Sequence, residues 1–214
     1  MNSREIRSIS ESVRLTDRQR EIITGLLLGD GHLETQNRGR TFRLKVEHSK
    51  HQKDYVDWLY QQLNNMVLTP PQSKLQTVAG KVYEKYWFST ISSGALRFYA
   101  QQFYQNKHKI LPKLIHKWLS PLAITVWFMD DGSLKSNRHR ALIFNTQSFS
   151  KTEVLRLSKI MEDKFGIAMA LRKQSRKTEE LYQLITIKDG AEKLAELIKP
   201  YILPSMKYKL GKLG

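Results

Sequence analysis

The stretches ITGLLLGDG at residues 23–31 and ITVWFMDDG at residues 124–132 decide the fold of this chain. Each is an apolar run with helical character that ends in Asp-Gly. Thr16 opens a T-x-x-Q capping box that predicts the start of the first helix, and Ser120-Pro121 predicts the start of the second. Two capped apolar helices with the same ending predict an internal repeat of about a hundred residues.

Other runs recur at the same offset, so the repeat extends through most of the chain. Each half is predicted to contain, in order, a helix, two strands, a helix, two strands and a closing helix, which makes an α+β fold. The runs that carry this prediction are 41–48, 52–63, 83–90 and 95–104 in the first half, and 141–147, 150–164, 169–173, 182–187 and 191–198 in the second. The predicted division is an N-terminal extension at 1–15, a first half at 16–112, a linker at 113–119 and a second half at 120–214.

The charge of the chain points to a polyanionic partner. Lys and Arg number 36 against 20 Asp and Glu, which leaves a formal net charge of +16. Nucleic acid is the expected partner, and an anionic membrane surface is the weaker alternative because no apolar run is long enough to span a bilayer. The chain has no cysteine, which excludes disulfides and cysteine-based zinc sites. The start, MNSREIRSISESVRL, lacks the apolar segment of a secretory signal, so an intracellular protein is expected, in a bacterial cytoplasm or an organelle matrix.

Asp30 and Asp131 are the candidate metal ligands. Taken singly, Asp-Gly after a helix is ordinary termination with a solvated carboxylate. An acidic residue at a helix C-terminus, however, faces the negative end of the helix dipole, and here this occurs twice at equivalent places. Carboxylates that hold Mg²⁺ with open water positions suit phosphodiester hydrolysis, and Mn²⁺ is expected to substitute for Mg²⁺.

Two lysines lie at matched distances from these carboxylates. Asp30 and Lys109 are 79 positions apart, and Asp131 and Lys209 are 78 apart. The alternative is that both lysines simply contact phosphate, but we expect them to support catalysis, because a nearby ammonium could offset the charge that builds on the phosphate as it reacts. If the register differs by one pair, the residues concerned are Lys107 and Lys207.

The two Asp-Gly runs, with NTQSF at residues 145–149 and the closing Tyr-Lys-Leu at 208–210, resemble the LAGLIDADG homing endonucleases. The resemblance is to the monomeric two-motif branch typified by the mitochondrial omega-intron endonuclease, and it covers residues 16–210. It implies two αββαββα halves, a central pair of signature helices, and antiparallel sheets that form a DNA-binding saddle.

The resemblance also implies roles for single residues. Asp30 and Asp131 would bind the catalytic ions, with the carbonyls of Gly29 and Asp130 as further ligands, and a lysine of each half would order the attacking water. The positions of these lysines match Lys109 and Lys209. The small residues that let such helices approach are Gly25 and Gly29 in the first motif but Val126 and Asp130 in the second, so an asymmetric crossing is expected.

Sequence reading is expected from strand faces that point away from the core. Phe42, Leu44 and Val46 alternate with charged residues, which should turn the charged ones outward. The candidate base-reading residues are Arg43 and Lys45 in the first half and Asn145 and Gln147 in the second. The candidate phosphate contacts in polar loops are Arg38, Arg40, Lys135, Arg138 and Arg140. Arg172 and Lys173 are neighbours in a strand-like run, so only one of them can face the groove. For each of these residues, a solvated surface position is an equal alternative.

These observations predict a monomeric, site-specific, Mg²⁺-dependent double-strand DNA endonuclease. Its target should be long and imperfectly symmetric, because the two halves differ, and its gene is expected to lie in a mobile intron. The main alternative is an intron RNA maturase of the same fold, which also needs a basic surface. A DNA-binding regulator that has lost cleavage is a third interpretation, and the presence of both Asp30 and Asp131 argues against it.

Overall fold

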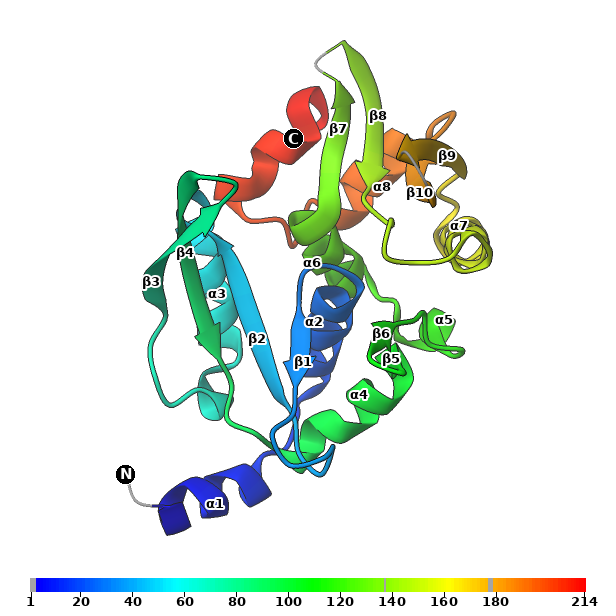
Figure 1. The fold of residues 1–214 in the computed structure, drawn as a ribbon. Helices are drawn as coiled ribbons and strands as arrows, with labels where there is room; N and C mark the ends of the chain where they lie inside the picture. Colours follow the sequence, from blue (N-terminus) through cyan, green and yellow to red (C-terminus); the bar gives the residue numbers. More distant parts are fainter. Residues whose placement is uncertain (1–2, 137, 177–178) are drawn as a thin grey trace. The chain divides into compact units, whose positions relative to one another are not determined.

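The computed structural model describes residues 3–136, 138–176 and 179–214. The chain forms two four-stranded antiparallel sheets (Figure 1). The strand orders, β1-β2-β4-β3 and β7-β8-β10-β9, are the same when the sheets are read from their first strands. The strands are β1 (His32–Glu34), β2 (Arg43–Ser49), β3 (Gln72–Val78), β4 (Lys81–Ser89), β7 (Gly132–Ser136), β8 (His139–Phe144), β9 (Met169–Arg176) and β10 (Glu179–Thr186). The shared order confirms the predicted repeat.

Helices complete an αββαββα order in each half, which confirms the predicted α+β fold. They are α2 (Asp17–Leu28), α3 (Lys53–Gln62) and α4 (Arg97–Phe103) in the first half, and α6 (Pro121–Asp131), α7 (Lys151–Phe165) and α8 (Gly190–Ile198) in the second. Outside this order lie α1 (Ser3–Ser12), β5 (Tyr104–Gln105), β6 (His108–Lys109), α5 (Ile115–Trp118), and 3-10 helices at Lys50–Gln52, Asn64–Met66, Gly94–Leu96 and Pro204–Leu213. Among the described residues no helix is long and apolar enough to cross a bilayer.

The predicted helix starts are present as side-chain caps. Thr16 and Gln19 exchange hydrogen bonds between side chain and main chain, at 3.1 and 3.2 Å, and this capping box precedes α2. Ser120 accepts from the main-chain N–H of Ala123 at 3.1 Å, with Pro121 as the first residue of α6. These local bonds satisfy N–H groups that a helix end leaves unpaired.

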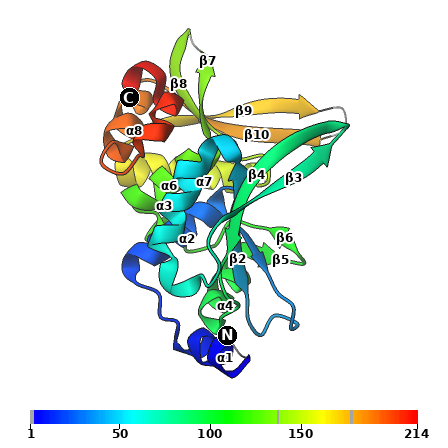
Figure 2. The same cartoon turned by 90° about the vertical axis from the view of Figure 1, so that its left-hand side faces the viewer.

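The alternation predicted for β2 is also present. Leu44 and Val46 are buried, whereas Arg43 and Lys45, which alternate with them, are half-exposed. The helix α3 lies against β2 and β4 (Figure 2). His48 continues the buried face of the strand. The charged residues of β2 therefore point away from the core, as the period of two requires.

An equivalent hydrogen bond in each half shows which residues of the two halves correspond. The main-chain N–H of Leu44 donates to the Thr90 hydroxyl at 2.9 Å, and that of Leu142 donates to the Thr186 hydroxyl at 2.9 Å. Counting on from Leu44 and Leu142, Glu47 of the first half occupies the position of Asn145 in the second.

Three strand predictions were wrong in detail. The strand predicted at 141–147 ends at Phe144, so Asn145 and Gln147 follow it rather than lie within it. Lys135 and Arg140, predicted in a loop, lie on β7 and β8. The strand β3 had no predicted range, because nearly all its side chains are exposed and no burial pattern marks it.

The chain forms two compact units. Residues up to Ile23 and Asp30–Gln101 make the first, and Thr24–Gly29 and Gln102–Gly214 make the second. The chain passes from one unit to the other inside α2, between Gly29 and Asp30, and between Gln101 and Gln102, so residues 113–119, the predicted linker, lie within the second unit. The linker predicted there contains α5.

Glycine allows the end of α2 to approach α6 within the second unit. A Cβ placed on Gly25 would lie 2.4 Å from the Ala123 carbonyl oxygen and 2.7 Å from the Val126 Cβ. On Gly29 it would lie 2.5 Å from the Cβ of Asp130. Each glycine of α2 therefore faces a larger residue of α6, Val126 or Asp130, and the asymmetric crossing stays a prediction.

Candidate active site and nucleic-acid interface

Asp131 is the last residue of α6, and its main chain is held by Asn145. The carbonyl oxygen of Asp131 accepts from both the main-chain N–H and the side-chain Nδ2 of Asn145, each at 3.0 Å. Asn145 Oδ1 in turn accepts from Nε2 of Gln183 at 2.6 Å, and Gln183 Oε1 accepts from Nε2 of Gln174 at 2.7 Å. Since Gln183 lies on β10 and Gln174 on β9, a chain of amides links the Asp131 backbone to the second sheet.

The two predicted lysines lie at the ends of the signature helices. Lys109 Nζ donates to the carbonyl oxygen of Gly29 at 2.7 Å. Lys209 Nζ donates to the carbonyl oxygens of Met129 and, at 3.0 Å, of Asp130. Helix C-termini carry partial negative charge, so an ammonium is favourable at both places. Lys209 is buried, and its two carbonyl partners offset much of the cost of removing its charge from water.

The alternative lysines do not share this geometry. Lys107 and Lys207 are exposed. The matched Asp-to-Lys intervals therefore lead to Lys109 and Lys209, and their ammonium groups touch the very carbonyls, of Gly29 and Asp130, that the resemblance assigns to the metals.

Asp30 follows α2 in the first unit, and its side chain is 52% exposed. Its Oδ2 lies 3.7 Å from Nδ1 of His48, whose ring is buried against Tyr55 with the centroids 5.1 Å apart. The carboxylate opens on a cavity of about 490 Å³ that Glu47 and Lys85 also line.

The donor groups fit a hard cation that keeps its water. Among the described residues no three His, Asp or Glu side chains gather closely enough to hold an ion by themselves. Asp30 and Asp131 would each offer carboxylate oxygens, which are hard ligands, to a cation. Mg²⁺ is bound in this way when it acts on phosphates, usually through one or two carboxylates.

Ion pairs cover the outer face of the first sheet. Arg43 donates to Glu34 Oε2 from Nε at 2.9 Å and from Nη2 at 2.7 Å. Glu47 forms ion pairs, with its Oε2 3.1 Å from Nζ of Lys45 and 2.7 Å from Nζ of Lys74. Burial raises the pKa of Glu47, but the hydrogen bonds and charges of Lys74 and Lys45 outweigh it, so this pKa lies below its ordinary value of 4.5.

Residues of β3 and β4 also reach this face and were missed from the sequence. Lys74 Nζ lies 5.7 Å from the ring centroid of Trp87, and both line a groove of about 410 Å³ with Arg43 and Lys45. Lys74 could not be assigned because β3 has no hydrophobic pattern. The groove adds a third basic side chain and an aromatic ring to the two predicted base-reading residues.

On the second sheet the register separates the two predicted neighbours. Arg172 pairs with Gln183, whereas Lys173 pairs with Tyr182, whose side chain is buried. Arg172 therefore shares the face of the amide chain, and Lys173, bonded to Glu180, lies on the opposite face. Gln147 lies near the amide chain, with Nε2 3.5 Å from the Oδ1 of Asn145.

The predicted phosphate contacts are all exposed. Arg38 and Arg40 lie in the loop between β1 and β2, and Arg138 lies in the turn between β7 and β8. Lys135 and Arg140 flank this turn on the strands, and Arg140 lies 3.7 Å from Glu192. Their exposure suits contacts with a backbone outside the protein.

Comparison with known proteins gives matches along most of the chain. Residues 20–194 match the model of the LAGLIDADG DNA endonuclease family. DNA endonuclease I-ChuI of Chlamydomonas applanata is 29% identical over 209 residues, which cover 92% of this chain and 96% of that protein. Cytochrome b mRNA maturase bI2 of Debaryomyces hansenii is 32% identical over 195 residues, which cover 89% and 72%. The structure of the homing endonuclease I-WcaI bound to its DNA recognition sequence has a TM-score of 0.88 at 25% identity, over 98% of this chain and 93% of that one.

Proposed function

The chain belongs to the LAGLIDADG DNA endonuclease family, and from this premise we propose that it cuts both strands of a long, imperfectly symmetric DNA target with Mg²⁺. The observation that carries the proposal is the matched lysine at each signature helix. Lys109 donates to Gly29, and Lys209 donates to Asp130, each next to a candidate metal ligand. A binding protein that does not cut has no need of this repeated arrangement.

Each side chain has a stated role in the proposed reaction. Asp30 and Asp131 would hold the cations, and Mn²⁺ is expected to replace Mg²⁺. A bound cation would neutralise phosphate charge and lower the pKa of a water molecule, which is the chemistry that makes a nucleophile available at neutral pH. Lys109 and Lys209 orient that water and offset charge on the phosphate as it reacts. Asn145 fixes the Asp131 backbone and so the direction of its carboxylate.

The partner that this proposal assigns is double-stranded DNA. The relative I-WcaI is described bound to its DNA recognition sequence, which supports the assignment. Because one chain carries two unequal halves, a monomer suffices for two unequal half-sites. An intron-encoded protein that works in a bacterial cytoplasm or an organelle matrix fits this reading.

A second candidate is a maturase that binds intron RNA. It is favoured by one observation, the 32% identity to cytochrome b mRNA maturase bI2. A maturase needs the basic surface but neither the carboxylates nor the lysines at the helix ends. The effect of removing a carboxylate therefore separates the two functions.

The test is cleavage of a pooled library of long DNA duplexes, with Mg²⁺ or with EDTA, followed by sequencing of the cut ends. We expect one family of sites, cut on both strands with Mg²⁺ and uncut with EDTA. Asp163→Asn is the matched control, because Asp163 is an exposed carboxylate on α7 that pairs with Lys159, four residues away on the same helix. Failure to cut any duplex, with tight binding to a structured RNA, would favour the maturase.

A further inference from the structure

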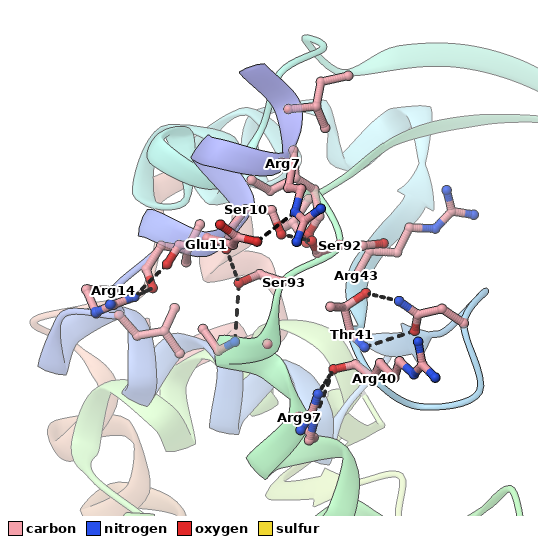
Figure 3. A pocket seen from close by; sticks show the side chains of 18 of the residues that line it. Arg7, Ser10, Glu11, Arg14, Arg40, Thr41, Arg43, Ser92, Ser93 and Arg97 are labelled. Atoms are coloured by element: carbon pink, nitrogen blue, oxygen red, sulfur yellow. Dashed lines mark hydrogen bonds and ion pairs between the residues drawn. The ribbon is translucent and has the colours of Figure 1, made fainter. Parts of the chain in front are cut away.

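A cavity lined by arginine lies in the first unit, outside the candidate active site. It has a volume of about 920 Å³ and is enclosed by α1, the loop before β2 and the segment 90–97 (Figure 3). Six arginines and a single acidic residue, Glu11, line it. The arginines are Arg7, Arg14, Arg20, Arg40, Arg43 and Arg97.

The wall that α1 contributes is fixed in place. The Ser10 hydroxyl donates to the Ser92 carbonyl oxygen at 2.5 Å, and the Ser93 hydroxyl donates to the Ser10 carbonyl oxygen at 2.9 Å. Val13, just after α1, is buried. These two reciprocal bonds attach the N-terminal extension to the segment before α4, so the cavity is a built feature.

Carboxylates compensate only part of the positive charge. Arg7 pairs with Glu11 at 2.9 Å, Arg20 with Asp17 at 3.7 Å, and Arg43 with Glu34 at 2.7 Å. Within the described part of the chain, no carboxylate pairs with Arg14, Arg40 or Arg97.

Two of these arginines use main-chain oxygens to shape the wall. Arg14 Nη1 donates to the carbonyl oxygens of Glu11 and Val13, and Arg97 Nε donates to that of Arg40 at 2.8 Å. A guanidinium has five N–H donors, so each keeps donors for a ligand. Like charges gathered around one cavity repel one another, and an anion would relieve that repulsion.

Arginine recognises phosphate through parallel hydrogen bonds, so a polyphosphate backbone is the ligand chemistry that this cavity fits. The cavity shares Arg43 with the groove on the outer face of the first sheet. Arg40, a predicted phosphate contact, also lines it. A duplex on the sheet would therefore reach the cavity without interruption, and this continuity favours DNA over a separate RNA.

We infer that the arginine cavity binds the sugar–phosphate backbone of duplex DNA beyond the base pairs that the first sheet contacts. The inference rests on the proposed DNA-binding function and extends it. The N-terminal extension thereby lengthens the footprint of the first half without reading sequence.

The experiment measures affinity, so that it does not depend on cleavage. A target is selected by binding in Ca²⁺, and three duplexes are compared: the core target, and the core extended by about ten base pairs at one end or at the other. Wild type should bind one extended duplex more tightly, with a steeper dependence on salt. Arg14→Gln and Arg97→Gln should each lower that slope by about one unit per lost phosphate contact and leave core binding unchanged.

Arg18→Gln is the matched control, because it removes the same charge from the first unit outside the cavity, where Arg18 bonds to Gln62. Thermal unfolding of Arg14→Gln and of Arg97→Gln is compared with that of wild type, so that misfolding of either variant is detected. The inference is wrong if neither extension improves binding, or if Arg18→Gln changes DNA binding as Arg14→Gln and Arg97→Gln do. It is also wrong if Arg14→Gln and Arg97→Gln weaken the binding of a structured RNA but not that of the extended duplex. A bound target that Mg²⁺ leaves uncut would overturn the endonuclease proposal alone.

Discussion

Asp30 lies just beyond α2 and Asp131 is the last residue of α6, and the groups around these matched carboxylates differ in kind. In the first half, Glu47 lies between Lys45 and Lys74, and His48 lies 3.7 Å from Asp30. At the position of Glu47, the second half has Asn145, which binds the Asp131 carbonyl and a chain of neutral amides.

The difference indicates how each carboxylate is positioned. The carboxylate of Asp30 opens on a cavity lined by charged residues, and Asp30 lies beyond the end of α2. The carboxylate of the second half belongs to the last residue of α6, and its main chain is attached to the strands that face the DNA in the proposed complex. The halves are therefore expected to cut their strands at different rates, and disturbance of one site should show strand by strand.

The largest effect should follow from removal of either carboxylate. Asp30→Asn and Asp131→Asn should each abolish double-strand cutting, because an amide is a weak ligand for Mg²⁺ and leaves phosphate charge uncompensated. Affinity for the target in Ca²⁺ should stay near wild type. The measurement is cleavage of a duplex labelled on both strands, which also reveals whether one variant leaves more nicking than the other. Double-strand cutting that survives in both variants would refute the metal-site assignment.

The lysines at the helix ends should have the next largest effect. Lys109→Met or Lys209→Met should slow cutting on the order of a hundredfold, as the loss of a transition-state donor does. Single-turnover rates in the bound complex measure this, with Lys107→Met and Lys207→Met as matched controls from exposed positions nearby. Weaker binding with an unchanged rate would make Lys109 and Lys209 plain phosphate contacts.

Base preference tests the sheet faces of the two halves. Arg43→Ala should relax preference in the first half-site, and Gln147→Ala or Arg172→Ala in the second, by about 1–3 kcal/mol at one or two positions. Lys173→Ala is the control for Arg172→Ala, because the register turns Lys173 to the opposite face.

Lys135→Ala and Arg138→Ala should instead weaken binding to all target sequences alike and lower the slope of the salt dependence by about one unit per lost contact. Profiling on a target library separates the two patterns, and an unchanged preference in all three sheet variants would mean that the wrong face was chosen.

A smaller effect is expected from Asn145. Asn145→Ala removes one of the two hydrogen bonds to the Asp131 carbonyl and keeps the main-chain one, so cutting of one strand should slow about tenfold. Glu47→Gln, at the matched position of the first half, should not slow that strand. The two strands are followed separately in single-turnover reactions. Equal slowing of both strands by Asn145→Ala would contradict a role confined to the second half.

The features that the sequence predicts well are local or repeated. The caps at Thr16 and Ser120 involve residues three positions apart, and the alternation of β2 follows from its period. Lys109 and Lys209 were found because the repeat keeps their distance from the acidic residues.

The features that were missed depend on how distant segments meet. The strand β8 ends at Phe144, where its ladder with β10 stops at Leu184, although the alternation of apolar residues predicted a strand as far as Gln147. Asn145 was therefore predicted on a strand as a base-reading residue, whereas its side chain is bonded to Asp131 and Gln183. The arginine cavity combines α1, the loop before β2 and the segment before α4, and no spacing rule brings these together.

The smallest expected effect concerns the helices that follow β2 and β8. The helix α7 begins with a full capping box at Ser150 and Glu153, whereas α3 begins at Gln52 without a side-chain cap. Glu153 also accepts from the Leu111 main-chain N–H at 2.7 Å. Burial raises the pKa of Glu153, whereas the hydrogen bonds from Leu111 and Ser150 lower it. Together the hydrogen bonds have the larger effect, so this pKa lies below its ordinary value of 4.5.

A carboxylate whose pKa is lowered by folding stabilises the protein above its unfolded pKa, and that contribution is lost as the pH falls through the folded value. Glu153→Gln should therefore reduce the free energy of unfolding by about 1 kcal/mol at neutral pH, and the difference from wild type should shrink below about pH 4.5. Urea unfolding at several pH values measures both effects. Glu162→Gln, on the same helix, is the control and should change little. A difference that stays constant down to acid pH would mean that Glu153 contributes through packing and not through its charge, and the two helix starts would then be electrostatically alike.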